Sequence, residues 1–453
     1  MTTTQERAAA PLEDFRRLHP LTPVLRGWRV LAVLFALLLQ NSLRSPGALD
    51  VLVFLGVGVP VALAYGWLSW RFTRFGVVDG DLTLETGVLF RRSRRVTLAR
   101  LEAVDVVRPL FARALGLAEL RLEVAGAGST EAALAYLSEP HAHRLRSELL
   151  ARAAGIDAAT PEAPEHVLVR VPLSAVVWSS VLRGPVIAGI LWLVLVIAGA
   201  MAVGELAALG LVVPLVLGTG GALVTYVMSN FDFTVAESPD GLRLRHGLLE
   251  TRAQTVAPGR VQAVRVAQPL LWRRRGWVRV DVNVAGYGGG QGSGQSTTLL
   301  PVAPRPVALS VLQHVLPGVD IDAVPLAGVP PRARWRAPVQ WRQLGVGADE
   351  RVFVARRGRF FRELMAVPHA RTQSVRLTRG PWQRRLGLAT VHVDTAAGPV
   401  QVEAAHRDAT EARQLVEAQA RRAQQARAIA VPQRWMTTAQ SPPVLEQGQG
   451  GRP

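Results

Sequence analysis

Four stretches of the chain are apolar enough to cross a membrane as α-helices. Val51–Trp70, Gly184–Gly204 and Leu206–Asn230 carry no charged side chain, and each is long enough to cross about 30 Å of hydrocarbon. The remaining stretch, Trp28–Leu43, is shorter and carries Arg29 at its start. A cleaved signal peptide is an alternative for it, but the next apolar stretch follows almost at once. The pattern therefore predicts four transmembrane helices in two hairpins.

Outside these stretches, hydrophobic positions alternate with a period of two, which is typical of half-buried strands. Leu82 and Leu84 show this period in one place, and Val280 and Val282 in another. Helical periodicity follows each set of strands, over Ser138–Arg152, Pro304–Val315 and Asp408–Arg427. Ser138 and Asp408 are suitable N-cap residues for two of these helices. Short antiparallel strands followed by one amphipathic helix predict a small barrel-like sheet closed by the helix.

The strand-and-helix pattern belongs to one unit that occurs three times. The first two copies align without a gap at an offset of 160 residues, with 17 of 45 positions identical, and the third aligns with the second at an offset of 111. A glycine pair spaced by 29 residues marks every copy: Gly87 and Gly116, Gly247 and Gly276, Gly358 and Gly387. Self-similarity at a fixed spacing indicates a repeat architecture. The glycines are expected to be structural, at turns that need a positive φ.

These patterns divide the chain into segments. The prediction is an N-terminal segment (1–27), a first transmembrane hairpin (28–70), a first unit (71–155), a linker (156–175), a second hairpin (176–230), a second unit (231–316), a linker (317–334), a third unit (335–430) and a disordered tail (431–453). The third unit has no predicted span directly before it.

Composition and charge agree with a membrane protein that carries soluble parts. Hydrophobic residues make up 49% and charged residues 19% of the chain, and the net charge of +18 comes from arginine alone because lysine is absent. Arginines precede the first hairpin and follow it, at Arg26 and Arg71 among others, whereas only Glu205 lies between the third and fourth spans. By the positive-inside tendency, the units and both termini are expected in the cytoplasm of a bacterial cell, with the spans in the plasma membrane.

No pattern for catalysis or cofactor binding is present. The chain has no cysteine, and its histidines, including His141 and His143, do not form a metal-ligand motif. Gly288–Gly294 matches neither a phosphate loop nor a dinucleotide fingerprint, and the basic stretches lack the interleaved aromatic residues typical of single-strand nucleic-acid binding. The sequence therefore predicts no enzyme, no metal, no cofactor and no nucleic-acid partner.

Arginine is the candidate functional residue that recurs in every copy. Arg113, Arg273 and Arg384 lie three residues before the second glycine, and Arg274 and Arg385 adjoin the later two. Arginine suits phosphate because of its planar, bidentate donors, so these side chains are candidates to contact an anionic lipid headgroup or a partner. The alternative is that each arginine holds its own loop. A second recurring set lies between core-facing valines and is expected to be structural: Arg100, Arg260 and Arg371.

Three stretches carry a resemblance to a known family: Val96–Val124, Val256–Val284 and Val367–Thr395. Each resembles the bacterial PH-domain membrane proteins of the YdbT type, in which paired spans precede small PH-like domains. The resemblance implies membrane α-helical hairpins plus three α+β PH-like domains, each a small antiparallel β barrel or sandwich capped by a C-terminal helix. It also implies a companion PH-domain membrane protein as a partner.

Together these observations predict a non-enzymatic integral membrane protein. Its PH-like domains are expected to bind a protein, anionic lipids of the inner leaflet, or both, as an assembly platform. Exposed sheet edges would let adjacent domains pair with one another or with the companion, and a homo-oligomer is also compatible. The alternative function is a component of a membrane transport or export complex. The absence of charged residues in the spans argues against a pump.

Overall fold

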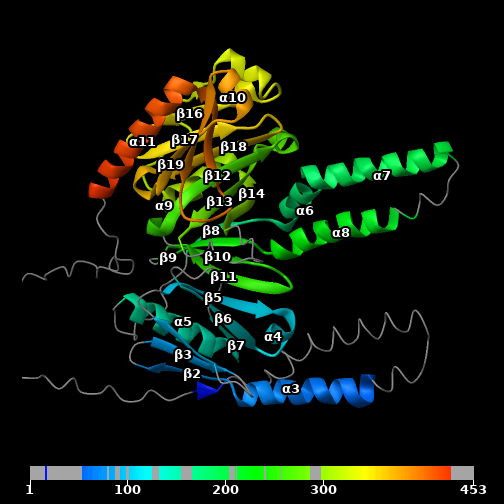
Figure 1. Cartoon of the computed structure of the whole chain (residues 1–453). Coiled ribbons are helices and arrows are strands. Elements are labelled where there is room, and N and C mark those ends of the chain that lie inside the picture. The colour runs from blue at the N-terminus through cyan, green and yellow to red at the C-terminus, as the bar shows by residue number, and fades with distance from the viewer. Residues whose placement is uncertain are drawn as a thin grey trace, which may run out of the picture.

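The structure consists of three β-rich units stacked along one axis, with long helices that extend to one side (Figure 1). This computed structural model describes residues 16–17, 54–78, 81–86, 92–97, 101–124, 132–154, 166–203, 210, 212–238, 241–256, 258–285 and 297–429. The predicted first span and the predicted tail lie outside these residues.

Each unit contains a first group of up to four strands, then three more strands and a C-terminal helix. Unit 1 comprises β1 (Arg16–Arg17), β2 (Arg74–Val78), β3 (Asp81–Thr86), β4 (Arg92–Thr97), β5 (Leu101–Pro109), α4 (Leu110–Ala114), β6 (Leu117–Val124), β7 (Ala132–Ser138) and α5 (Glu139–Ala154).

Unit 2 has the same order with helices inserted after its first strand. It comprises β8 (His166–Arg170), α6 (Leu173–Val181), α7 (Gly184–Val203), α8 (Val212–Ser229), β9 (Thr234–Ser238), β10 (Gly241–His246), β11 (Glu250–Val256), η4 (Pro258–Arg260), β12 (Val261–Pro269), η5 (Leu270–Arg275), β13 (Trp277–Val284), β14 (Thr297–Pro304) and α9 (Arg305–Val315).

Unit 3 ends the stack. It comprises β15 (Ala327–Gly328), η6 (Pro331–Trp335), η7 (Trp341–Gln343), β16 (Gly345–Ala348), β17 (Val352–Arg357), β18 (Phe361–Pro368), η8 (His369–Arg371), β19 (Ser374–Thr378), α10 (Pro381–Arg385), β20 (Leu388–Asp394), β21 (Val402–Asp408) and α11 (Ala409–Ile429). The three predicted C-terminal helices are confirmed as α5, α9 and α11. Asp408 caps α11, since its Oδ1 accepts the backbone N–H of Thr410 at 2.9 Å.

The sheets do not stop at the unit boundaries. The last three strands of unit 1 continue into the first four of unit 2 in the order β7-β6-β5-β11-β10-β9-β8, and unit 2 continues into unit 3 in the order β14-β13-β12-β18-β17-β16-β15. The expectation that adjacent units pair through their sheet edges is therefore confirmed. Two seven-stranded antiparallel sheets join three units into one body.

The first strand of units 2 and 3 lies in a segment predicted as a linker. β8 pairs with β9 and β15 pairs with β16, although α6, α7 and α8 separate β8 from its partner. These strands have no recognisable sequence pattern, because each is short and its pairing depends on a strand beyond an intervening segment. The long helical hairpin is thus inserted into a unit whose strands hold both of its ends.

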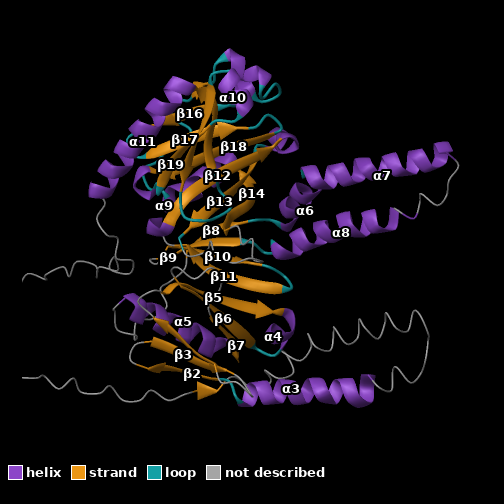
Figure 2. Cartoon of the chain, viewed as in Figure 1, coloured by secondary structure: helices purple, strands orange, loops and turns teal. Residues whose placement is uncertain are grey.

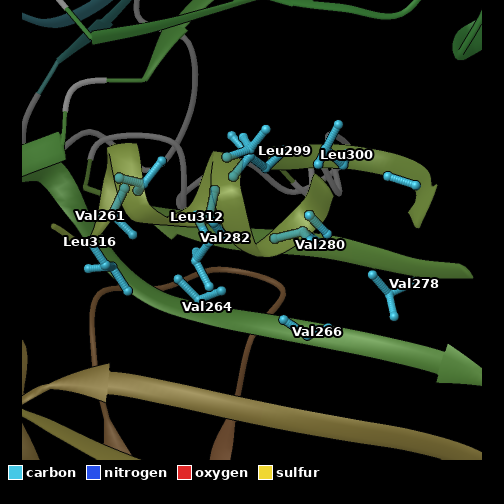
Figure 3. Close-up of a cluster of buried hydrophobic side chains, with 14 of the residues drawn as sticks. Val261, Val264, Val266, Val278, Val280, Val282, Leu299, Leu300, Leu312 and Leu316 are labelled. Atoms are coloured by element: carbon cyan, nitrogen blue, oxygen red, sulfur yellow. The ribbon is translucent and has the colours of Figure 1, made fainter. Parts of the chain in front are cut away.

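The main hydrophobic core belongs to unit 2 and extends into unit 3. Valines of β12 and β13 pack against Leu299 and Leu300 of β14 and against Leu312 of α9 (Figure 3). Val354 and Ala366 of unit 3 are members of the same cluster. Burial of apolar side chains is the main favourable term in folding, so units 2 and 3 stabilise each other.

Two described helices are long and apolar enough to cross a membrane. They are α7, over Gly184–Ala202, and α8, over Val212–Ser229, and nearly all of both lies outside the packed body (Figure 2). In the region of Val51–Trp70 the structure has a π-helical turn η1 (Phe54–Gly58) and α3 (Val59–Arg71), which is shorter. The prediction of four transmembrane helices is therefore not confirmed. Among the described residues, two helices are long and apolar enough to cross a membrane.

Candidate functional site

The arginine shared by all copies reaches from one unit to the next. Arg113 on α4 donates a hydrogen bond to the Thr251 hydroxyl of unit 2, at 3.2 Å. Arg273 on η5 donates a hydrogen bond to the carbonyl oxygen of Arg359, in the β17–β18 turn of unit 3. These contacts connect unit 1 to unit 2 and unit 2 to unit 3. The sequence analysis expected these arginines either to bind a ligand or to hold their own loop, and it did not predict a contact between units.

The third copy of this arginine lies in unit 3, where the described residues show no hydrogen bond from it to another unit. Arg384 and its neighbour Arg385 are exposed on α10, and Arg274 is exposed on η5. Within the described part of the chain, no hydrogen bond or ion pair occupies these three guanidinium groups. Their role as contacts for a headgroup or a partner remains a prediction, as it does for Arg113 and Arg273.

The residues predicted to be structural lie at turns and strand starts. Gly116, Gly247, Gly276, Gly358 and Gly387 all have positive φ. At Gly247 and Gly358 an added Cβ would lie 2.1 Å and 1.8 Å from a backbone carbonyl oxygen of the same turn, so these hairpins require glycine. Arg260 and Arg371 are half-buried in η4 and η8. Gly87 and Arg100 lie outside the described residues.

The two inter-unit junctions have the same register. β5 pairs with β11 from Pro109 opposite Glu250, and β12 pairs with β18 from Pro269 opposite Phe361. These pairs occupy equivalent repeat positions. An ion pair with a carboxylate on the following unit supports each junction: Arg121 with Glu250 at 3.4 Å, and Arg265 with Glu363 at 3.7 Å.

A buried amide adds to the second junction. Asn283 of β13 donates to the carbonyl oxygen of Val400 at 2.7 Å and accepts the Val400 N–H at 2.8 Å. Both residues are buried, so this side chain satisfies two backbone groups that water does not reach.

A fully buried carboxylate lies near the base of the long hairpin. Asp281 accepts hydrogen bonds from Arg265 and Arg279, both at 2.8 Å, and is 0% exposed. Burial alone would raise the pKa of Asp281, but the two arginines outweigh burial and lower it, so the side chain stays ionised. Because Arg265 also pairs with Glu363, the charges connect β13 to unit 3. No sequence motif indicated this cluster.

A cavity of about 520 Å³ lies where the end of α8 meets units 1 and 2, lined among others by Tyr226, Asn230, His246 and Arg279. The ring of Tyr226 lies under the guanidinium of Arg183, 4.1 Å from ring centre to Cζ. Burial lowers the pKa of His246, whose Nδ1–H donates to the Ser229 carbonyl at 2.7 Å. These contacts attach the hairpin to the body. Among the described residues, no three acidic or histidine side chains are placed to hold a metal ion.

Comparison with known proteins identifies the repeat. The family model described as "Bacterial PH domain" matches this chain three times, over residues 29–153, 175–319 and 322–423. No curated protein and no solved structure matches the chain. The three matches cover most of the sequence and follow the three structural units; the match to unit 3 includes β15, whereas the match to unit 2 begins after β8. The chain therefore belongs to the bacterial PH domain family and carries three copies of the domain in one polypeptide.

Proposed function

We propose that this protein is a non-enzymatic integral membrane protein of the YdbT type. Its PH units would form an assembly platform at the cytoplasmic face of a bacterial plasma membrane. The observation that carries the proposal is the α7–α8 hairpin. Its two helices have no acidic or basic side chain, each is long enough to span the hydrocarbon, and both project from the body with their apolar side chains exposed.

The hairpin is suited to anchoring because the unit holds both of its ends. β8 leads into it through α6, and β9 leaves it, and these two strands pair with each other. Arg183 precedes α7 and Arg71 ends α3, so both helices have arginine at the end nearest the body. This distribution favours a cytoplasmic body under the positive-inside tendency. The lack of charge within α7 and α8 favours an anchor over a transport pathway.

PH domains commonly bind lipids or proteins, and one end of the stack supports protein binding. β19 is the terminal strand of its sheet and is equivalent to β5 and β12, which each pair with a following unit. Arg384 is equivalent in the repeat to Arg113 and Arg273, each of which donates a hydrogen bond to the following unit. We propose that a strand of a companion PH-domain membrane protein pairs with β19, with a carboxylate in the role of Glu250 and Glu363.

A second copy of this chain is a poorer partner for the same edge. The strand equivalent to β11 and β18 in unit 1 is β4, which is terminal in its own sheet. Its sequence, Arg92–Thr97, has three arginines and no acidic residue, and it would meet Arg376 of β19. Like charges across a strand pair are destabilising, so head-to-tail assembly of identical chains is disfavoured.

Membrane anchoring is tested by alkaline carbonate extraction of cell membranes. An integral protein stays in the membrane pellet, and recovery of the full chain in the soluble fraction would contradict the proposal. Partner binding is tested by a photo-crosslinking residue at Arg385, with Arg413 on the exposed face of α11 as the matched control. We expect a crosslink to a second PH-domain membrane protein at Arg385 only, which Arg384→Ala weakens. Equal crosslinking at both positions would argue against the β19 edge as the binding site.

A further inference from the structure

One surface of the body exposes large apolar side chains beside arginines. It consists of η5, the β17–β18 turn and the first residue of β18; a hydrogen bond from Arg273 to the Arg359 carbonyl joins η5 to the turn. Leu270, Leu271, Phe360 and Phe361 are 45, 42, 53 and 51% exposed. We name these four residues, with Arg274 and Arg275, the tip surface. Exposed leucine or phenylalanine is common singly, but a contiguous group of this size usually marks an interaction site.

The tip surface lies at the base of the α7–α8 hairpin. Trp272, between its leucines and arginines, donates a hydrogen bond from Nε1 to the Ser179 carbonyl of α6 at 3.2 Å. The ring of Phe361 lies against Gly184, the first residue of α7, because a Cβ built there would be 2.6 Å from Phe361 Cζ. The surface is therefore level with the point where the apolar helix begins.

Two equivalent positions of the first junction repeat this arrangement. Leu110 of α4, equivalent to Leu270, and Leu249 in the β10–β11 turn, equivalent to Phe360, are also exposed, as is Leu115 directly after α4. That turn is attached to the end of α8, since the Leu248 N–H donates to the Met228 carbonyl at 2.8 Å. In Figure 1, α4 lies on the side of the stack from which α3, α7 and α8 extend. Apolar side chains are thus exposed on the hairpin side at both junctions.

The chemistry of the tip surface fits the headgroup region of a bilayer. The neighbours of the apolar side chains along the chain are exposed arginines: Arg274 and Arg275 on η5, Arg359 in the turn and Arg362 at the start of β18. Apolar groups that enter the interface, together with arginines that meet anionic headgroups, are the usual features of interfacial anchoring. Trp178 of α6 is also exposed, and Arg275 lies 5.6 Å from its ring centre. Tryptophan is enriched at this level of membrane proteins.

We propose that the tip surface inserts its leucines and phenylalanines into the headgroup region of an anionic bilayer. It would thereby hold unit 3, which has no span-length apolar helix among its described residues, flat against the membrane. This inference rests on the proposed insertion of α7 and α8, because that insertion sets the level of the bilayer. On this proposal, the tip surface contacts the lipid, and the arginines shared by the repeats, such as Arg113 and Arg384, do not.

The absence of cysteine allows a clean test, because a single introduced cysteine can carry an environment-sensitive fluorophore. The full chain would be labelled at Phe360→Cys and reconstituted in vesicles of neutral phosphatidylcholine, with or without phosphatidylglycerol. Glu350→Cys, in the exposed turn at the other end of β17, is the matched control, and Leu195→Cys within α7 reports insertion of the hairpin. Quenching by shallow and deep nitroxide lipids and by aqueous iodide would be compared.

We expect shallow nitroxide lipid to quench the Phe360 label several-fold more than the Glu350 label, and more strongly with phosphatidylglycerol present. Arg274→Glu combined with Arg362→Glu should reduce that dependence on anionic lipid. If the Leu195 label is quenched by deep nitroxide but the Phe360 label is open to iodide, the inference is wrong and the anchoring proposal stands. If neither lipid quencher reaches Leu195, both fail. If Phe360 is shielded from iodide and lipid alike, a protein covers the surface and the inference is overturned.

Discussion

Replacing the buried Asp281 with asparagine should loosen the second inter-unit junction. The change keeps the size of the side chain and removes its charge. Arg279 and Arg265 would then face each other without the carboxylate that both contact at 2.8 Å. Asp281 is 0% exposed and the two arginine side chains are only 17% and 22% exposed, so water can solvate little of the remaining charge.

The size of the effect follows from this burial. Removing one partner of a buried ion pair costs about 3–5 kcal/mol, because the other charge is left uncompensated. We expect the lower end, about 3 kcal/mol, since Arg265 keeps a second carboxylate, Glu363, at 3.7 Å. A loss of about 3 kcal/mol corresponds to roughly a hundredfold larger population of the locally opened state.

Hydrogen–deuterium exchange with mass spectrometry on the solubilised full chain measures this population. Peptides from β12, β13 and β18 should exchange much faster in Asp281→Asn than in the parent, while peptides from β5 and β6 should not change. Glu350→Gln removes an exposed acidic side chain and is the control for a general charge effect. Removing Arg279 as well, in Asp281→Leu with Arg279→Met, should restore part of the protection because less unpaired charge stays buried. Unchanged exchange of β12 and β13 in Asp281→Asn would refute this reasoning.

Three further changes test other contacts. Gly358→Ala should destabilise unit 3 by at least about 1–3 kcal/mol, because φ is +84° and the new Cβ would lie 1.8 Å from a carbonyl oxygen; Gly276→Ala, with open space at its Cβ, should have a smaller effect in thermal melting. Asn283→Ala leaves the buried N–H and carbonyl of Val400 unpaired, at about 1–3 kcal/mol each, and should speed exchange of the peptide that contains Val400; unchanged exchange would mean that the bonds form elsewhere. Burial holds the folded-state pKa of His246 below its usual value of 6.5. The neutral side chain therefore contributes fully to folding stability above pH 6.5, and this contribution is lost as the pH falls through the folded-state pKa. The drop in melting temperature on acidification should therefore be smaller in His246→Gln, and an equal drop would count against the assignment.

The sequence by itself determined the local structure and the repeat. Alternating valines specify strands because side chains in a strand alternate between two faces, and Asp408 marks the start of α11 because its carboxylate can accept free N–H groups there. Gly247 and Gly358 mark tight hairpins, since a side chain would collide with the turn. The apolar hairpin was equally visible, because composition over about 20 residues is enough to detect it. Each of these signals depends on neighbours close in sequence.

Only the tertiary structure decided how the units join. Every strand edge offers the same backbone donors and acceptors, so a hydrophobic pattern reveals which face of a strand is buried but not which strand lies beside it. Three features of this kind are contacts between segments distant in sequence. They are the pairing of β5 with β11, the hydrogen bonds from Arg113 and Arg273 to the next unit, and the pairing of β8 with β9. The exposure of Phe360 and Phe361 is decided in the same way, because an apolar residue at the end of a hairpin is buried or exposed according to what packs against it. In this chain that position lies beside the base of a long apolar helix.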